Sequence, residues 1–302
     1  MAAGPDVRIP DSAPPATVGV VGLGLIGASL LGALRTHLPA VRRLAVARRE
    51  EIAGRAVADG LAHEAGGRVD ILSGADVVVL CTPVDAMPGW IASIGEAVPG
   101  ALVTDGGSTK AWIEARAREL LGPGRFVGGH PLAGREQSGY DAADPGLFEG
   151  ALWVLTPGDD ASAERAGPWA AAVRALGAEV VTLDAAAHDA ALAVASHIPF
   201  ALSAALMRAA ARDPAWRDGA LAATGFRDMV RVAGGDPAMY AAITATNAGP
   251  MLAVLDALQS EIDGLRAVLS GTPEDARAWF AAARDARAAW LSARARSGRP
   301  VR

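Results

Sequence analysis

From Thr17 to about Asp184, short β-rich runs alternate along the chain with longer helical runs of hydrophobic residues. This alternation is typical of βαβ units and predicts a mostly parallel sheet in a doubly wound α/β domain. The predicted strands are Thr17–Val21, Arg43–Ala47, Asp76–Cys81, Leu102–Asp105, Arg125–Gly128, Leu152–Thr156 and Glu179–Leu183. Helical spacing falls between them, at Ile26–Leu34, Ala86–Ala97, Lys110–Leu120 and Ala163–Leu176.

After Asp184 the strand pattern stops, and the remaining residues predict helices with breaks near Arg212–Pro214, Ala233–Pro237 and Ser270–Pro273. We therefore expect a tail over 1–16, an α/β domain over 17–184 and an all-helical domain over 185–302. The alanine-rich helix faces carry more apolar side chains than one layer needs, which favours packing against a second copy in a homodimer. Packing within the chain explains the pattern nearly as well.

The composition excludes several kinds of partner and site. The net charge is −5, and no cluster of Lys and Arg alternates with aromatic residues, so neither nucleic acid nor an anionic membrane is an expected partner. Cys81 is the only cysteine, which excludes an internal disulfide and a multi-thiolate metal site, and we expect no metal. The start of the chain lacks the apolar core of a signal peptide, and the apolar run 185–211 carries too many polar groups for a membrane span. The expected location is the cytoplasm.

A glycine turn directly follows the first predicted strand and leads into a helix: Gly22, Leu23, Gly24, Leu25, Ile26, Gly27. The first glycine permits the tight turn, the second lets a pyrophosphate approach the backbone, and the third lets helix and strand pack closely. In this context the motif predicts a Rossmann-type domain that binds NAD or NADP. A tight turn without a nucleotide is the competing interpretation.

The end of the second predicted strand bears on the choice between the two cofactors. An acidic residue there would bind the ribose hydroxyls of NAD, but the strand is followed by Arg48 and Arg49. Two guanidinium groups suit the 2′-phosphate of NADP, so the sequence favours NADP. The alternative is that both arginines are solvated charges that balance Glu50 and Glu51. Thr82 and Pro83, which close the third strand, are further candidates for cofactor contacts.

Ser108 and His130 follow successive predicted strands and are the candidates for chemistry. Ligands of open α/β sheets bind beyond the carboxyl ends of the strands, so both side chains should face the cofactor crevice. A neutral histidine there can take a proton from a hydroxyl group while hydride leaves the same carbon. Ser108 is equally suited to cap the helix that begins near Lys110.

The chain resembles the prephenate and arogenate dehydrogenases of tyrosine biosynthesis. The resemblance rests on Gly22–Gly27, Asp105–Lys110, the block GHPLAGREQSG at Gly129–Gly139, SHIP at Ser196–Pro199 and GFRDMVRVAGGDP at Gly225–Pro237, in that order along both domains. It implies oxidative decarboxylation: hydride passes to NAD(P)+, carbon dioxide leaves and the ring becomes aromatic. The implied fold is a Rossmann-type domain followed by an all-helical dimerisation domain.

The resemblance also implies roles for individual residues. His130 would deprotonate or polarise the substrate hydroxyl, Ser108 would orient His130 and contact the nicotinamide or the hydroxyl, and Arg231 would bind the ring carboxylate. The remaining implied substrate contacts are His197, Arg227, Glu136 and Tyr240, the last reaching across a dimer. From the residues alone, Arg227 and Arg231 are surface partners of Asp228 or Asp236, and His197 is a core histidine.

Prephenate is the first choice of substrate, with 4-hydroxyphenylpyruvate as product, and arogenate, which would give tyrosine directly, is the alternative. Two other classes of function compete. A β-hydroxyacid dehydrogenase or imine reductase relies mainly on a lysine or other polar groups in its helical half, whereas this helical half is nearly free of lysine. A protein that senses NADP without catalysis would bind the cofactor but make no use of His130.

Overall fold

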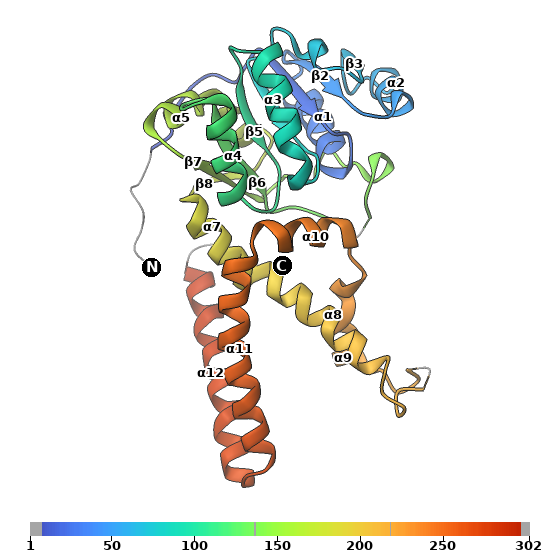
Figure 1. Ribbon diagram of the computed structural model, residues 1–302, viewed down its shortest axis with the longest axis vertical. Coiled ribbons are helices and arrows are strands. Elements are labelled where there is room, and N and C mark those ends of the chain that lie inside the picture. The colour runs from blue at the N-terminus through green and yellow to red at the C-terminus, as the bar shows by residue number, and fades with distance from the viewer. Residues whose placement is uncertain (1–7, 136, 218, 297–302) are drawn as a thin grey trace. The chain divides into compact units, whose positions relative to one another are not determined.

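The computed structural model describes residues 8–135, 137–217 and 219–296. Its core is one eight-stranded sheet with the strand order β3-β2-β1-β4-β5-β6-β7-β8 (Figure 1). All neighbouring strands run parallel except β6 and β7, which are antiparallel. The strands are β1 (Thr17–Val21), β2 (Arg42–Val46), β3 (Glu64–Gly66), β4 (Val77–Leu80), β5 (Leu102–Asp105), β6 (Phe126–Pro131), β7 (Leu152–Pro157) and β8 (Glu179–Thr182).

Helices cover both faces of the sheet, and each face has its own buried core. One core includes Leu30 and Leu34 with Trp153 and Trp169, and the other is built around Ile91 and its neighbours. These helices are α1 (Leu25–His37), α2 (Glu50–Ala58), α3 (Met87–Ala97), α4 (Ala111–Leu121), α5 (Asp160–Arg165) and α6 (Gly167–Ala175). The short turns are η1 (Val69–Leu72), η2 (Val84–Ala86) and η3 (Tyr140–Ala142). The prediction of a doubly wound Rossmann-type domain is confirmed.

Three details differ from the prediction. β3 and α2 were not predicted, and β3 has only three residues, too few for an alternating pattern. The predicted helix Ala163–Leu176 is two helices, α5 and α6, because Pro168 lacks the amide that a continuous helix needs. β6 continues past Gly128 to Pro131, so His130 lies within a strand, paired with Val154 of β7, and not in a turn after it.

The remainder is helical, as predicted. Breaks occur at the three predicted places, and a further break that was not predicted falls at Asn247. The elements are α7 (Ala185–Leu192), a π-helical turn η4 (Ala193–His197), α8 (Ile198–Ala210), α9 (Thr224–Val230), η5 (Arg231–Gly234), α10 (Pro237–Thr246), α11 (Ala248–Leu269) and α12 (Pro273–Arg296). By length and composition alone, Ala185–Ala210 is apolar enough to cross a membrane. In this fold, however, His188, Asp189 and His197 of that stretch are buried in polar contacts with other elements.

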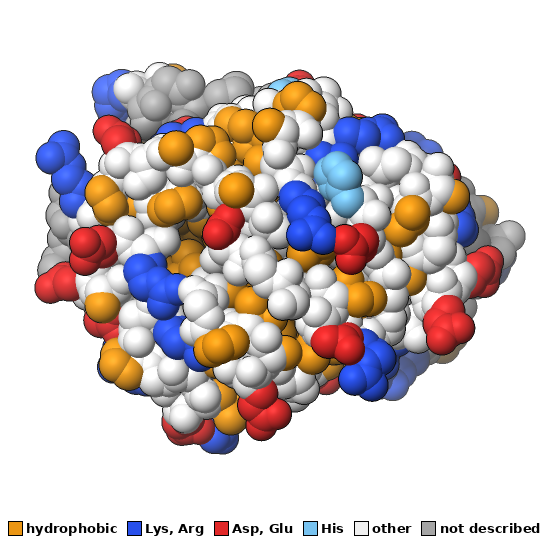
Figure 2. All heavy atoms as spheres, turned by 90° about the horizontal axis from the view of Figure 1, so that it is seen from above, with side chains coloured by type: hydrophobic (Ala, Val, Ile, Leu, Met, Phe, Trp, Pro, Cys, Tyr) orange, Lys and Arg blue, Asp and Glu red, His pale blue; other side chains and the backbone are white. Residues whose placement is uncertain are grey.

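The chain divides into two compact units, the first ending at Met251 and the second beginning at Leu252. The second unit consists of the rest of α11 and of α12, and α12 buries none of its described residues. It exposes large apolar side chains, including Ile262, Phe280 and Trp290. On the face shown in Figure 2, acidic and basic side chains are interspersed among the described residues, without a continuous basic stripe. The domain boundary at 184 stays a prediction.

Candidate active site

The turn between β1 and α1 has the form of a phosphate-binding loop. Gly22 has φ +94, and a Cβ there would lie 2.8 Å from the carbonyl oxygen of Cys81. A Cβ on Gly27 would lie 1.9 Å from the carbonyl oxygen of Gly22, so helix and turn require a glycine at both positions. Gly24 is different, because a Cβ there would have none of the described atoms within 4 Å. Its open side lies at the uncapped amino end of α1, where a pyrophosphate fits.

The position of this loop in the sheet also fits a dinucleotide. The strand order reverses between β1 and β4, and ligands of open α/β sheets bind at such a switch point. Thr82 follows β4, and its Oγ1 is buried without a hydrogen-bond partner in the described part of the chain. The Thr82 side chain lies 2.9 Å from the place of a Gly22 Cβ, so this hydroxyl is beside the loop. Pro83, the next residue, is exposed.

Arg48 and Arg49 follow β2 with exposed side chains, and Arg49 is the first flanking residue of α2. Ala47, where an NAD-binding acid would be expected, is only 6% exposed. The acidic residues nearby in sequence, Glu50 and Glu51, occupy the first turn of α2. Two cationic side chains therefore stand at this edge of the candidate nucleotide site.

A buried ion pair holds the peptide group that precedes His130. Lys110 Nζ pairs with the Asp105 carboxylate, and both side chains are 0% exposed. Lys110 Nζ also donates to the Gly129 carbonyl oxygen at 2.8 Å, while Asp105 Oδ1 accepts from the Gly129 amide at 2.9 Å. A Cβ on Gly129 would lie 2.3 Å from the Asp105 carbonyl oxygen. The glycine before His130 thus permits this close approach, and the ion pair fixes the backbone from both sides.

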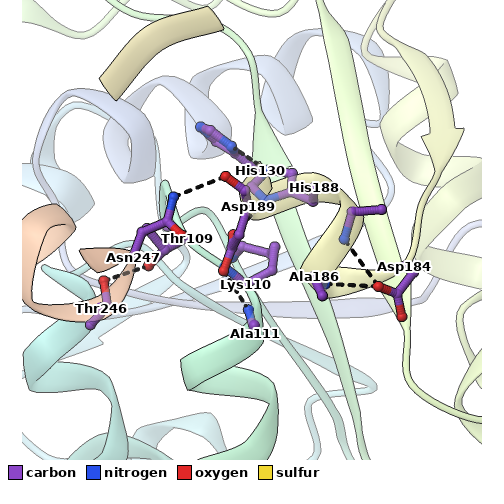
Figure 3. Close-up of polar contacts among 12 residues, drawn as sticks. Thr109, Lys110, Ala111, His130, Asp184, Ala186, His188, Asp189, Thr246 and Asn247 are labelled. Atoms are coloured by element: carbon purple, nitrogen blue, oxygen red, sulfur yellow. Dashed lines mark hydrogen bonds and ion pairs between the residues drawn. The ribbon is translucent and has the colours of Figure 1, made fainter. Parts of the chain in front are cut away.

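Helix α7 brings a second histidine and a carboxylate to the same place. It begins at Asp184, whose side chain accepts from the amides of Ala186 and Ala187 (Figure 3). One turn later, the Asp189 carboxylate accepts from the Lys110 amide at 2.7 Å and from the Ala111 amide at 2.9 Å. Asp189 therefore caps α4, and the positive end of the α4 dipole stabilises its charge.

These contacts build a relay from Asp189 through His188 to His130 (Figure 3). Nδ1 of His188 lies 2.8 Å from Asp189 Oδ1, and Nε2 of His188 lies 2.9 Å from Nδ1 of His130. A carboxylate only accepts, so His188 Nδ1 donates to it, and the tautomer of His188 with its single hydrogen on Nδ1 accepts at Nε2. His130 donates from Nδ1 in that arrangement, which leaves the lone pair on its Nε2.

The electrostatic surroundings favour the neutral form of His130. Burial, chiefly, and then the nearby His188, Lys110 and His197 hold the pKa of His130 well below its ordinary value of 6.5. At neutral pH the ring is therefore uncharged and can accept a proton at Nε2.

His197 lies at the end of the π-helical turn η4, just before Pro199 in the first turn of α8. Single π-turns of this kind often occur at functional sites. The residue is 1% exposed, and Asn247 Nδ2 lies 3.0 Å from its Nδ1. Burial is the main cause that lowers the pKa of His197 to about 4; Asp189 opposes the shift and His188 adds to it. His197 is thus a neutral side chain beside the relay.

Ser108 does not have the contacts expected of it. Within the described residues it makes no hydrogen bond with His130, whose Nδ1 is held by His188. It does not cap α4 either, because that helix begins after Lys110 and receives its cap from Asp189. The sequence could not indicate this, since the capping residue lies 79 positions away. The half-buried Ser108 follows β5 directly, so contact with the nicotinamide or the hydroxyl stays a prediction.

Three of the other predicted substrate residues lie in the helical part. Arg227 lies on α9 and Arg231 begins η5, both with exposed side chains, and these two elements pack against α8. Tyr240 stacks on Phe200 of the same chain. Its ring therefore has a packing partner without a second subunit. Glu136 lies outside the described residues. The roles of all four in substrate binding stay predictions.

The residues that sequence reasoning missed are His188, Asp189, Lys110 and Asn247. A signal was present for the first two: a His-Asp pair stands inside a helix that is otherwise almost entirely alanine and leucine. Lys110 was visible as the final residue of the Asp105–Lys110 segment, although its partner was not. Nothing in the sequence pattern pointed to Asn247. Among the described residues, no cluster of three His, Cys, Asp or Glu could hold a metal ion.

Two family models match the chain in succession. Residues 30–182 match the model described as "Prephenate dehydrogenase, nucleotide-binding domain", and residues 184–281 match "Prephenate dehydrogenase, dimerization domain". Together they cover the β6 histidine, the relay on α7 and most of the helical part.

Individual relatives agree with these models. The chain is 31% identical to the prephenate dehydrogenase of Bacillus subtilis over 87% of this chain and 72% of that enzyme. It is 32% identical to the Lactococcus lactis enzyme of the same name, but there the match covers 76% of this chain and only 64% of the relative. Among solved structures, the Synechocystis arogenate dehydrogenase is 34% identical, with a TM-score of 0.78 over 90% of this chain and 99% of that chain.

The Aquifex aeolicus prephenate dehydrogenase, solved with hydroxyphenyl propionate and NAD+, is 25% identical, with a TM-score of 0.84 over 93% of this chain and 98% of that one. The likeness therefore extends over both halves of the fold and is supported by identity of 30% or more to curated relatives. The chain belongs to the prephenate dehydrogenase family.

Proposed function

We propose that this protein oxidatively decarboxylates prephenate to 4-hydroxyphenylpyruvate with a nicotinamide dinucleotide as oxidant. The observation that carries the proposal is the relay from Asp189 through His188, which leaves the Nε2 lone pair of a buried, neutral His130 available. A base at this place in the sheet suits removal of a hydroxyl proton. Family membership supports the same reaction class.

In this proposal His130 Nε2 takes the proton of the ring hydroxyl while hydride leaves the carbon that bears it. The Gly22–Gly27 loop would hold the nicotinamide cofactor, which would supply the acceptor for that hydride. The bond between the ring and its carboxylate then breaks, and its electron pair completes the aromatic ring as carbon dioxide leaves. The proton held on His130 is free to return to the new phenolate oxygen. The Lys110–Asp105 pair keeps the His130 backbone in place through these steps.

Arg231 is our candidate for the ring carboxylate, because a guanidinium group offers a carboxylate two parallel donors. Arg227, four residues earlier, adds positive charge for a doubly negative substrate. His197 is the candidate contact for the substrate side chain, and Glu136 and Tyr240 are further candidates. Ser108 is proposed to contact the nicotinamide or the hydroxyl.

Arogenate is the second candidate substrate, and the 34% identity to the Synechocystis arogenate dehydrogenase supports it. The two substrates differ only in the side chain, which is a keto acid in prephenate and an amino acid in arogenate. The reacting carbon and the proposed base are the same for both.

One assay tests the proposed function. Purified protein is offered prephenate or arogenate, each with NAD+ or NADP+, and the appearance of reduced nicotinamide is followed by absorbance. We expect turnover with prephenate and identify the product by chromatography against 4-hydroxyphenylpyruvate. Turnover with arogenate alone would replace prephenate by the second candidate. An unchanged absorbance in all four mixtures would contradict the dehydrogenase function and favour a sensor that binds the cofactor without catalysis.

We further propose that NADP+ is the preferred cofactor, supported by the exposed Arg48 and Arg49 after β2. Replacing both with alanine should raise KM for NADP+ by at least about 10- to 100-fold, since even one charge-assisted hydrogen bond contributes ~1.5–3 kcal/mol. KM for NAD+ should change far less. The matched control is Arg42→Ala, which removes an exposed arginine from the opposite end of β2. Equal rises in KM for NADP+ and NAD+ would contradict the proposed preference for NADP+.

A cytoplasmic homodimer is the proposed form of the protein. The match of residues 184–281 to a dimerization domain supports it, as do the exposed apolar side chains of α11 and α12.

A further inference from the structure

Asn247 is a buried amide whose orientation is fixed by its neighbours (Figure 3). The side chain is 2% exposed and lies between α10 and α11, where φ is −131 and the chain leaves helical geometry. Its Nδ2 donates to the Asp189 carbonyl oxygen at 2.9 Å. A carbonyl oxygen only accepts, so the nitrogen of this amide, and not its oxygen, faces Asp189.

This orientation decides where the proton of His197 sits. The same Nδ2 lies 3.0 Å from His197 Nδ1, and an amide nitrogen can only donate. His197 Nδ1 therefore accepts, and in a neutral ring the hydrogen is on Nε2. That Nε2 is buried and has no hydrogen-bond partner in the described part of the chain. An unpaired buried donor is costly, which points to a partner supplied by a ligand.

The two histidines beside each other are thus set in opposite tautomers by different partners. The relay through His188 gives His130 a lone pair on Nε2, whereas Asn247 gives His197 a hydrogen on Nε2. One ring is suited to take a proton, and the other is suited to donate a hydrogen bond. The Asp189 residue joins both arrangements, through its carboxylate to His188 and through its carbonyl oxygen to Asn247.

We propose that Asn247 is a positioning residue that fixes His197 as an Nε2–H donor to an oxygen atom of the substrate side chain. The substrate part of this inference rests on the proposed function. A neutral N–H donor binds a keto or carboxylate oxygen and cannot accept from an ammonium group. His197 therefore contacts an oxygen in either candidate substrate and not the ammonium group of arogenate.

Ring-nitrogen NMR reads this tautomer directly. The chain has five histidines, so protein labelled with ¹⁵N in the histidine rings gives few signals, and His197→Gln assigns the one of interest. Without any ligand at neutral pH, we expect His197 to carry its hydrogen on Nε2, with Nδ1 free of one. A hydrogen on Nδ1, or a charged ring, overturns the proposal. This result stands apart from turnover, so an inactive protein would defeat the proposed function and not this inference.

Asn247→Asp tests whether the Asn247 amide sets the tautomer of His197. A carboxylate of the same shape accepts from Nδ1, so it should move the hydrogen of His197 to that nitrogen and raise KM for prephenate roughly 10- to 100-fold, with kcat much less affected. The control is Thr246→Val, which removes the neighbouring 2.8 Å contact with Thr109 and should leave the His197 spectrum unchanged. An unchanged His197 tautomer in Asn247→Asp overturns the proposal, as does an unchanged KM beside a lowered kcat.

The same variant identifies the substrate oxygen when both substrates are assayed. If KM rises for both prephenate and arogenate, the acceptor of the His197 hydrogen bond is the side-chain carboxylate that both substrates have. If KM rises for prephenate alone, the acceptor is its keto oxygen. Both results support the Nε2–H donor. If Asn247→Asp does not fold, the spectrum of the unaltered protein still decides the tautomer.

Discussion

Replacing His130 with asparagine is expected to lower kcat by about 10²- to 10⁴-fold, the usual contribution of a general base. Asparagine keeps a polar side chain of similar reach but offers no ring nitrogen to take the proton. The Gly22–Gly27 loop and the Lys110–Asp105 pair do not involve the imidazole, so the cofactor should bind as before. Initial rates with saturating substrate and a nucleotide-binding titration together check both parts.

The matched control is His37→Asn, which changes an exposed histidine at the end of α1 and should leave kcat unaltered. If the His130→Asn protein binds cofactor and retains more than about a tenth of the kcat, His130 is not the general base. Loss of cofactor affinity together with turnover would show instead that the substitution disturbed the nucleotide site.

Replacing Asp189 with asparagine is expected to lower kcat by a similar factor, about 10²- to 10⁴-fold, although Asp189 does not act on the substrate itself. With its nitrogen in the place of Oδ1, where the contact with the Lys110 amide is lost, the new amide donates to Nδ1 of His188, which then donates from Nε2 to His130. His130 accepts at Nδ1 and carries its hydrogen on Nε2, so the lone pair is lost from the atom that needs it. KM for substrate and cofactor should change little.

Asp189 also caps α4, so the variant should lose about 1 kcal/mol of stability, and thermal unfolding must be measured beside the kinetics. His188→Phe supplies an independent case, because it removes the partner of His130 and leaves the cap in place. Full kcat in a folded Asp189→Asn protein would show that the relay does not set the tautomer of His130. If a stabilising buffer restores the thermal stability of Asp189→Asn but not its kcat, the loss of kcat comes from the relay and not from the lost helix cap.

The fold was easier to predict from the sequence than the site was, for physical reasons. Periodic apolar runs indicated the strands and most helices of the sheet domain, because burial on one or both faces imposes a local pattern. The glycine turn was equally visible, since its backbone geometry demands glycine at Gly22 and Gly27. β3 was missed because its three residues carry no such pattern.

The site residues needed tertiary contacts that no local pattern contains. His130 was identified from its place after a glycine, but its partner was expected to be Ser108 on the adjacent strand. The partner in the structure is His188, which lies 58 positions away and is directed by the cap at Asp184. Asp189 serves α4 and the relay at once, a combination that only the folded chain reveals.

Ring-¹⁵N NMR of the unaltered protein shows whether His130 presents an unprotonated Nε2 at neutral pH. With the His130 signals assigned by His130→Asn, we expect a neutral ring with its hydrogen on Nδ1 and a lone pair on Nε2. A hydrogen on Nε2, or a ring charged at neutral pH, would contradict this expectation.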